Sequence, residues 1–482
     1  MKTFKSRHSL RFVFLSLLLG LGLVACAVGP DFKTPPAPKA TSFTREPNIL
    51  ESGSNASMAI DSQWWLAYGS SELDRLVELA LEHNPNIDVA IANLTIAKQN
   101  VIAQQGFFFP QVGAGYVASR QNVGATLAPA INTTNSVYNL QTAQLTVGFT
   151  PDIFGGNRRQ VESLMAAASA QQYQLDALRI TMATNVIATA VQEAVLREQI
   201  KLAQASVEAS RAQLAHTRLM AQKGYLSDLD MANQEAAYAQ AIAQIPALRK
   251  YREQALDLLS VLCGKLPSEQ LLLPNLDSIH IPDRLPASIP SNLVGQRPDV
   301  KIAEEFVRAS NAQIGVAISN MIPQFSIVGI VGGSAEVFSQ LFNGSNNIWG
   351  IAAGVGQPIF AGGTLLARKR AAEAGLDASV AQYRSTVLTA FQNVADTLYA
   401  IENDGQIYQA ARAGTNSYQK VFQKSELQFQ NGYAPEPAVL MAKQQYLQSK
   451  INEIQAFSTY LGDTAALYQS LGGGWTASNR NQ

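Results

Sequence analysis

The sequence predicts a membrane protein of the α+β class with an internal two-fold repeat. Three observations support this fold class: long helix-like segments, four shorter glycine-rich segments in which apolar and polar residues partly alternate, and the same landmarks in the same order in both halves of the chain. Only helices and closed β-barrels span a bilayer, because both satisfy their backbone polar groups internally. Internal repetition indicates that the two halves are built alike.

The repeat is carried by landmarks spaced along the whole chain. Pro85 and Pro110 flank a helix-like segment, and Pro298 and Pro323 flank a second one at the same spacing. Three further pairs follow in order: PDIFGGNRR at 151–159 with QPIFAGGTLLARKR at 357–370, AQKGYLSDL at 221–229 with FQNGYAPEP at 429–437, and SVLCGKL at 260–266 with YQSLGGG at 468–474. The period is far longer than the roughly 20–50 residues of a solenoid repeat.

The N-terminus has the layout of a secretory signal, with basic residues before an apolar run from Phe12 to Val24. The run is short for a transmembrane helix. It ends in L-V-A-C, which resembles a bacterial lipoprotein cleavage box that makes Cys26 the lipidated first residue of the mature chain. We predict a covalent lipid at Cys26 and no other cofactor; the alternative is an ordinary signal peptide with an incidental cysteine. Cys263 then has no partner for an internal disulfide and is expected to be buried and inert.

The longest helix-like segments predict two helical hairpins. No glycine or proline occurs from Asn157 to Lys223, which would form a rod of roughly 100 Å, and the second half repeats this segment from Thr364 to about Gln430. Apolar residues lie on more than one face, so each helix needs neighbours on two sides. The hairpin tips are expected at Gly224 and Gly432, where a helix places its left-handed terminal residue.

Four segments are predicted to cross a membrane as tilted β-strands, because their lengths suit such strands. They lie at about 110–121, 137–151, 323–335 and 347–360. Four strands are too few to close a barrel, for which eight is about the minimum, and an open strand edge is not tolerated in lipid. Several copies of the chain must therefore share one barrel. The alternative is a pair of soluble hairpins.

Composition and motifs exclude several other classes of function. The formal net charge is zero, so the chain has no overall basic character of the kind that binds nucleic acid. Its histidines have no metal-ligand spacing, and neither a nucleophile elbow nor a P-loop is present. We therefore predict no metal site and no enzyme, and any energy for transport must come from partner proteins.

Several motifs together resemble the TolC-like outer-membrane factors, and in particular the NodT-type lipoproteins that serve multidrug efflux pumps. They are C-A-V-G-P-D-F at 26–32, W-W at 64–65, R-P-D-V at 297–300, N-A-Q-I-G-V-A at 311–317, Q-N-V-A-D at 392–396 and L-G-G-G-W at 471–475. The similarity covers nearly the whole mature chain. It implies a homotrimer in which each subunit gives four strands to a 12-stranded transmembrane β-barrel and its long helices to a periplasmic α-helical barrel.

The resemblance also implies partners and a location. The partners are a periplasmic adaptor (membrane fusion) protein and an inner-membrane pump of the RND class, and the trimer sits in outer-membrane lipid. Ala27 after the cysteine resembles lipoproteins that are sorted to the outer membrane. The expected function is a passive exit duct in a tripartite efflux system. A duct for type I protein secretion and a structural periplasmic coiled-coil lipoprotein remain as alternatives.

The resemblance places a gate at the hairpin tips, where family members carry acidic residues a few positions after the tip glycine. Asp230 matches such a position and Asp228 lies beside it. After the second tip the matching region holds Met441, with only Glu436 nearby and Pro437 next to it, so this constriction is expected to be apolar. The alternative is that the two aspartates only stabilise a helix N-terminus.

The motif Arg297-Pro298-Asp299 is expected to be architectural. A charge pair beside a helix-opening proline favours a structural role over substrate contact.

These predictions divide the chain into six parts: a signal peptide at 1–25, a lipidated extended segment at 26–62, a first half at 63–270, a linker at 271–296, a second half at 297–475 and a tail at 476–482.

Overall fold

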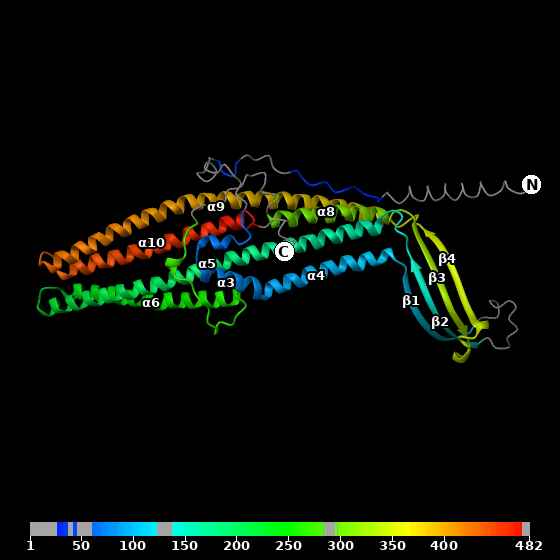
Figure 1. Cartoon of the computed structure of the whole chain (residues 1–482), viewed down its shortest axis with the longest axis horizontal. Coiled ribbons are helices and arrows are strands. Elements are labelled where there is room, and N and C mark those ends of the chain that lie inside the picture. The colour runs from blue at the N-terminus through cyan, green and yellow to red at the C-terminus, as the bar shows by residue number, and fades with distance from the viewer. Residues whose placement is uncertain are drawn as a thin grey trace, which may run out of the picture. The chain divides into compact units, whose positions relative to one another are not determined.

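A computed structural model describes residues 27–36, 42–45, 60–122, 137–282, 285, 295 and 297–474. The predictions for the signal peptide, for Cys26 and for the tail lie outside these residues. Within them, the order of helices and strands occurs twice, as the repeat predicts (Figure 1).

The first copy contains α3 (Ser71–His83), α4 (Pro85–Gln105), β1 (Gln111–Asn122), β2 (Val137–Phe149), α5 (Gly156–Gln222) and α6 (Asp228–Leu262). The second contains α8 (Pro298–Ser319), β3 (Gln324–Ala335), β4 (Asn347–Gly356), α9 (Thr364–Gln430) and α10 (Glu436–Ser470). Both copies thus contain a helix (α4 or α8), two strands and a long helical hairpin, and the first copy has α3 in addition. None of the described helices is long and apolar enough to cross a membrane.

The two compact units of the chain are not the two sequence repeats. One unit contains the described residues of 1–35, 93–171 and 303–383, and the other contains those of 36–92, 172–302 and 384–482. Each unit therefore combines matching parts of both copies. The reason in the first unit is that β2 of one copy pairs with β3 of the other, so neither copy forms a separate domain.

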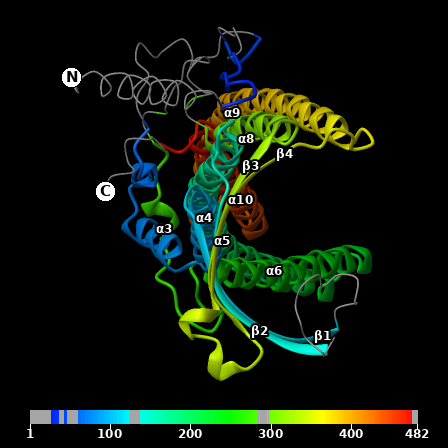
Figure 2. The same cartoon turned by 90° about the vertical axis from the view of Figure 1, so that its right-hand side faces the viewer.

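The first unit holds a single antiparallel sheet with the strand order β1-β2-β3-β4. The strands curve along their length (Figure 2). The β2–β3 pairing, from Gln141↔Ala335 to Phe149↔Ile327, joins what could otherwise have been two separate hairpins. β2 and β4 end at Phe149 and Gly356, short of the predicted 151 and 360. Both stop just before a proline, which has no N–H to donate to a strand ladder.

Both long hairpins turn in the same way. Gly224 and Gly432 have φ values of 79° and 75°. At the first tip the N–H of Gly224 donates to Ala221 (2.9 Å) and that of Tyr225 to Met220 (3.0 Å); at the second tip Gly432 and Tyr433 make the equivalent bonds. This is the Schellman arrangement, which satisfies the last carbonyls of a helix. The tip positions predicted from the glycines are confirmed.

The second unit has a core in which distant segments meet. Tyr68 is buried, and its hydroxyl lies 3.0 Å from the hydroxyl of Thr464 in α10. Trp64 stacks on Tyr468 with ring centroids 4.8 Å apart. Cys263 caps the end of α6 and is buried as expected, and burial raises the pKa of its thiol to about 11.

Candidate functional site: the sheet and the hairpin tips

The sheet has two chemically different faces, because residues directly opposite in neighbouring strands point to the same side. We define the apolar face by the register of the strands. Its apolar side chains are Val112, Ala114, Tyr116, Ala118, Val137, Ala143, Leu145, Val147, Phe149, Phe325, Ile327, Val331, Ala335, Trp349, Ile351, Ala353 and Val355; the same side also carries Gly329 and Gly333 and, at the strand ends away from the helices, Arg120, Asn122, Asn139, Gln141 and Asn347. This confirms the alternation seen in the sequence of the second strand.

The opposite side is the polar face. It carries amide and hydroxyl side chains among glycines and a few aliphatic residues, and the polar members are Gln111, Ser119, Gln121, Thr142, Gln144, Thr146, Gln324, Ser326 and Ser334. A sheet with one apolar and one polar face is typical of strands that separate lipid from a water-filled channel.

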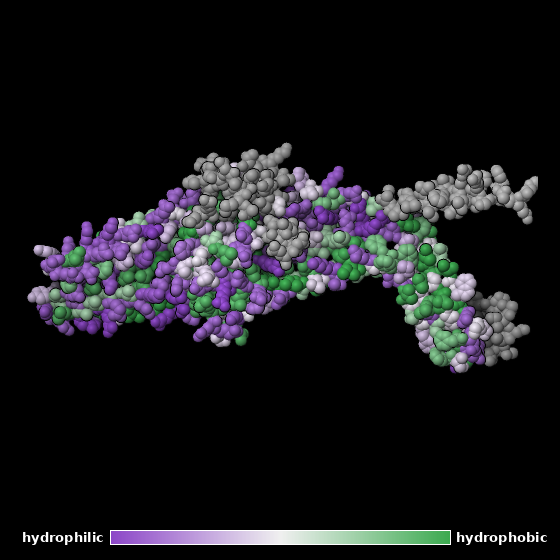
Figure 3. Space-filling view, viewed as in Figure 1, coloured by the Kyte–Doolittle hydropathy of each residue, from purple (hydrophilic) through white to green (hydrophobic). Residues whose placement is uncertain are grey.

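The apolar face is strongly exposed on the single chain. Trp349, Ile351 and Val355 in β4 have 79%, 76% and 63% of their surface accessible. Hydrophobic residues gather over the strands in the space-filling view (Figure 3). An apolar area of this kind marks a contact with a membrane or another protein.

The sheet also has two open edges. Among the described residues, β1 pairs only with β2 and β4 only with β3, so the outer backbone groups of β1 and β4 have no strand partner. Unpaired N–H and C=O groups each cost several kcal/mol in lipid. The sheet is therefore incomplete as a membrane structure until β1 and β4 find partners.

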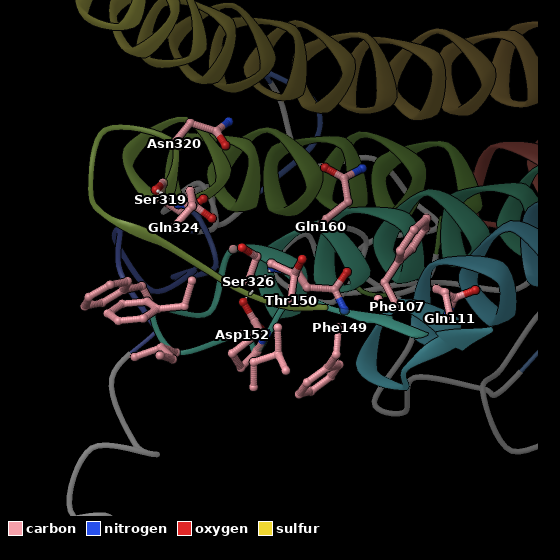
Figure 4. Close-up of a pocket in the computed structure, with 18 of the residues that line it drawn as sticks. Phe107, Gln111, Phe149, Thr150, Asp152, Gln160, Ser319, Asn320, Gln324 and Ser326 are labelled. Carbon is pink, nitrogen blue, oxygen red and sulfur yellow. Dashed lines mark hydrogen bonds between the residues drawn. The ribbon is translucent and has the colours of Figure 1, made fainter. Parts of the chain in front are cut away.

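A hollow of about 690 Å³ lies where the strands join the helices of the first unit. Side chains from several elements converge on it, among them Phe107, Gln111, Gln160 and Gln324 (Figure 4). The carboxylate of Asp152 also lines it, but both oxygens accept hydrogen bonds at 2.9 Å from the first N–H groups of α5. This geometry caps the helix, and the rest of the lining consists of amides, hydroxyls, phenyl rings and aliphatic side chains such as Ile153 and Val316.

The described residues contain no group of three or more His, Cys, Asp or Glu side chains placed to hold a metal ion.

The first hairpin tip carries a reciprocal cap. The N–H of Asp230 donates to the Ser227 hydroxyl (3.2 Å), and the N–H of Ser227 donates back to the Asp230 carboxylate (3.0 Å). The hydrogen bonds from the Ser227 side chain and backbone hold the pKa of Asp230 below its ordinary value. Asp228 is exposed in the first turn of the same helix. The cap predicted for Asp230 is thus present, and the role of both aspartates at a gate stays a prediction.

The second tip differs in its chemistry. α10 starts at Glu436 with Pro435 as its N-cap and has no side-chain cap. Glu436 is exposed, Pro437 is half-buried, and Met441 is 60% exposed. The apolar constriction expected at this tip stays a prediction.

Arg297 braces the start of α8. Its guanidinium donates to both carboxylate oxygens of Asp299, at 2.9 and 2.6 Å, and to the carbonyl of Ser470 at 2.7 Å. Pro298 is the first residue of α8. The side chain of Arg297 is only 8% exposed, and these contacts join α8 to the end of α10. This geometry is that of an architectural element.

Two features of the structure were not predicted from the sequence. Burial, together with the neighbouring Asp404 carboxyl, raises the pKa of Asp463 to about 7. Nothing in the sequence relates these two residues, since they lie on different helices. The second feature is Arg159, whose side chain is 6% exposed and binds the N-terminal segment. The motifs at 26–32 and 311–317 were recognisable in the sequence, but nothing in them indicated that they meet at Arg159.

Comparison with known proteins gives consistent matches over most of the chain. The family model described as "Outer membrane efflux protein" matches residues 76–265 and 289–473. The pyoverdine export outer membrane protein OpmQ of Pseudomonas putida is 27% identical over 468 residues, covering 96% of this chain and 97% of OpmQ. The outer membrane protein OprJ of Pseudomonas aeruginosa is 28% identical over 477 residues, covering 95% of each chain. The solved structure of the outer-membrane channel OprN superposes with a TM-score of 0.82 at 25% identity, covering 93% of this chain and 100% of OprN.

Proposed function

Because the chain belongs to the outer membrane efflux protein family, we propose that it is the exit duct of an efflux system, supplied by an inner-membrane pump through a periplasmic adaptor. The chain is the outer-membrane component of an efflux pump and is not an enzyme. The pump and the adaptor supply the energy and the coupling, and the duct itself is passive. On the family resemblance, the pump belongs to the RND class.

The observation that carries this proposal is the incomplete two-faced sheet. Its apolar face needs lipid, its polar face needs water, and its edges at β1 and β4 need strand partners. Three copies joined edge to edge supply twelve strands, which exceeds the minimum of about eight for a barrel. We infer a homotrimer in which β1 of each copy pairs with β4 of the next, so that every polar face lines one channel.

The same proposal places the remaining parts. The strands lie in the outer membrane, and the hairpins α5–α6 and α9–α10 form a helical barrel in the periplasm. A covalent lipid on Cys26 anchors each subunit. The polar face of the sheet presents amides, hydroxyls and aliphatic side chains, and none of its described residues is charged. Such a lining gives little basis for selecting substrates by charge, so the pump sets the substrate range.

Deletion and complementation in the bacterium that carries this chain test the function. We expect a strain without the gene to accumulate a fluorescent pump substrate, and the wild-type chain to restore efflux. A variant with a disrupted sheet, such as Ile351→Arg, is the control and should restore less efflux than the wild-type chain. Unchanged accumulation in the deletion strain, together with loss of a secreted protein, would contradict efflux and support a type I secretion duct instead.

A further inference from the structure

We propose that residues 27–32 form a clasp, held by Arg159, Asn311 and Gly315, that fixes the lipid of Cys26 at the end of the sheet where the strands join the helices. This inference rests on the proposed lipidation of Cys26. It adds a role for the two motifs at 26–32 and 311–317, which the duct itself does not explain. All of its contacts lie within the first compact unit.

Arg159 is the centre of the clasp. Its guanidinium donates to the carbonyls of Val28 (3.1 Å) and Gly29 (3.3 Å) and to the carboxylates of Asp31 (2.7 Å) and Glu162 (2.8 Å). The side chain is only 6% exposed. A buried guanidinium is stable only when its donors are satisfied, and most of these acceptors belong to the N-terminal segment. The segment is therefore part of the fold of α5 and not a loose leader.

Helix α8 forms the other wall. Asn311 donates its side-chain amide to the carbonyl of Pro30 at 2.8 Å, and the guanidinium of Arg308 lies 4.7 Å from the centre of the Phe32 ring. Gly315 has no room for a side chain, because a Cβ there would lie 2.7 Å from the Val28 carbonyl oxygen. The motif at 311–317 thus supplies both a hydrogen bond and a flat surface to the motif at 26–32.

The clasp itself is shaped to fit this wall. Gly29 has a φ of 97°, and a Cβ on it would lie 2.6 Å from the Cα of Gly315. At the start of the clasp, the N–H of Val28 donates to the carbonyl of Phe154 at 3.0 Å. A Cβ on Gly155 would lie 2.7 Å from the Cα of Ala27. Such close approaches require glycine, because any side chain would push the two backbones apart.

Only one copy of the repeat is built for this contact. In the other copy, Leu366 takes the position of Arg159, because it follows Gly362 and Gly363 at the same spacing as Arg159 follows Gly155 and Gly156. Ile102 takes the position of Gly315, because it precedes Pro110 at the same spacing as Gly315 precedes Pro323. These counterparts, Leu366 and Ile102, are apolar and 45% and 57% exposed. The surface that binds residues 27–32 is therefore a specific feature of the α5–α8 pair and does not follow from the repeated fold alone.

The clasp determines where the lipid can go. Cys26 is the neighbour of Ala27, and adjacent Cα atoms are about 3.8 Å apart. Ala27 contacts Gly155, between the end of β2 and the start of α5. At this same end of the sheet β1 begins, β3 begins and β4 ends. The acyl chains and the strands are thus held at one membrane interface. Releasing the six clasp residues would allow the anchor to move by up to about 20 Å.

Hydrogen exchange on the membrane-embedded protein tests the clasp. Gly29→Ala should make the Val28 amide exchange at least about tenfold faster than in the wild type. Gly69→Ala is the matched control, because Gly69 also has a positive φ (69°) but nothing within 4 Å of its Cβ position. Gly315→Ala should act like Gly29→Ala from the helix side, whereas the helical Gly375→Ala, also in open space, should not.

The position of the lipid is tested by metabolic labelling with a photoactivatable fatty acid. In the wild type, crosslinks from the fatty acid should concentrate near Phe149–Phe154 and be rarer at the strand ends away from the helices. In Gly29→Ala this difference between the two ends of the sheet should be lost. Mass spectrometry of the N-terminus separates a failure of the proposed lipidation from a failure of the proposed clasp. An unmodified N-terminus contradicts the proposed lipidation. An acylated N-terminus with equally fast Val28 exchange in wild type and Gly29→Ala overturns the clasp, as does an even spread of crosslinks in the wild type.

Discussion

An arginine on the apolar face should disrupt membrane insertion far more than an arginine one residue away on the polar face. Ile351 and Ala352 are neighbours in β4, and the register places Ile351 opposite Gly329 and Ala352 opposite Val328. Both residues are exposed on the single chain. The pair Ile351→Arg and Ala352→Arg therefore changes the same strand by the same side chain and differs only in the face.

The expected magnitude follows from the position of Ile351 on the sheet. Aromatic residues flank its row on both sides along the strands: Phe149 and Phe325 toward the helices, Tyr116 and Trp349 toward the other end. Aromatic girdles mark the two interfaces of a membrane barrel, so Ile351 lies near the bilayer midplane, where an arginine costs about 2–4 kcal/mol. Per subunit this is a factor of about 30 to 900 in the folding equilibrium. At Ala352 the charge meets channel water, and we expect a cost below about 1 kcal/mol.

Folding into lipid vesicles measures this difference. Urea titration, with folded and unfolded species separated by their electrophoretic mobility without heating, gives the free energy of each variant. The wild type and Ala352→Arg should fold at similar urea concentrations, and Ile351→Arg should require much less urea to unfold. Equal losses in both variants, or a larger loss for Ala352→Arg, would refute the assignment of the apolar face to lipid.

Three further predictions concern the anchor, the gate and a buried carboxyl. Cys26→Ser should remove the acyl group from the mature N-terminus, as mass spectrometry shows directly, while the barrel still forms. Asp228→Ala combined with Asp230→Ala should weaken cation preference in planar bilayers without preventing assembly, because at least three carboxylates are lost from one narrow ring. Because the pKa of Asp230 is lowered, this carboxylate should stay charged, and keep contributing to cation preference, at more acidic pH than an ordinary aspartate would. Asp463→Asn should raise the thermal stability more at pH 8 than at pH 5. The native chain holds a proton on Asp463 up to a pKa of about 7, which the unfolded chain releases at lower pH, so stability falls as pH rises through this window.

Each of these has an outcome that contradicts it. An acylated Cys26→Ser protein, or a wild-type mature chain that starts at a residue other than Cys26, would contradict the lipoprotein assignment. Unchanged selectivity in a correctly assembled double variant would leave Asp228 and Asp230 as helix-capping residues only. An equal effect of Asp463→Asn at both pH values would show that the Asp404–Asp463 contact does not control the protonation of Asp463.

Local sequence signals predicted most of the elements. Alternation in the second strand indicated which side chains share a face, and the glycines at 224 and 432 indicated the hairpin tips, because a left-handed residue after a helix strongly favours glycine. The four strand segments were found by length and composition. Their ends were less accurate, since the predicted segments included prolines that cannot join a strand ladder.

Contacts between distant segments were not predictable from the same signals. The pairing of β2 with β3 depends on register across the two repeats, and it is this pairing that makes the first compact unit a mixture of both copies. Arg159 gives no local hint that its acceptors lie on residues 28–31. The motifs that meet there were recognisable separately, but only the fold shows that the glycines at 29 and 315 face each other.

The most direct test of the shared barrel is disulfide formation between copies. A cysteine at Ala114 in β1, combined in turn with one at each position of β4, places a possible crosslink across the proposed β1–β4 seam. Cysteines on adjacent strands can bond when their Cα atoms are about 4.4–6.8 Å apart, and the native Cys263 is buried. The shared barrel predicts that a few adjacent β4 positions give a covalently closed trimer on non-reducing gels. Crosslinked dimers alone, or no crosslink at any position in correctly inserted protein, would contradict a barrel completed by three copies.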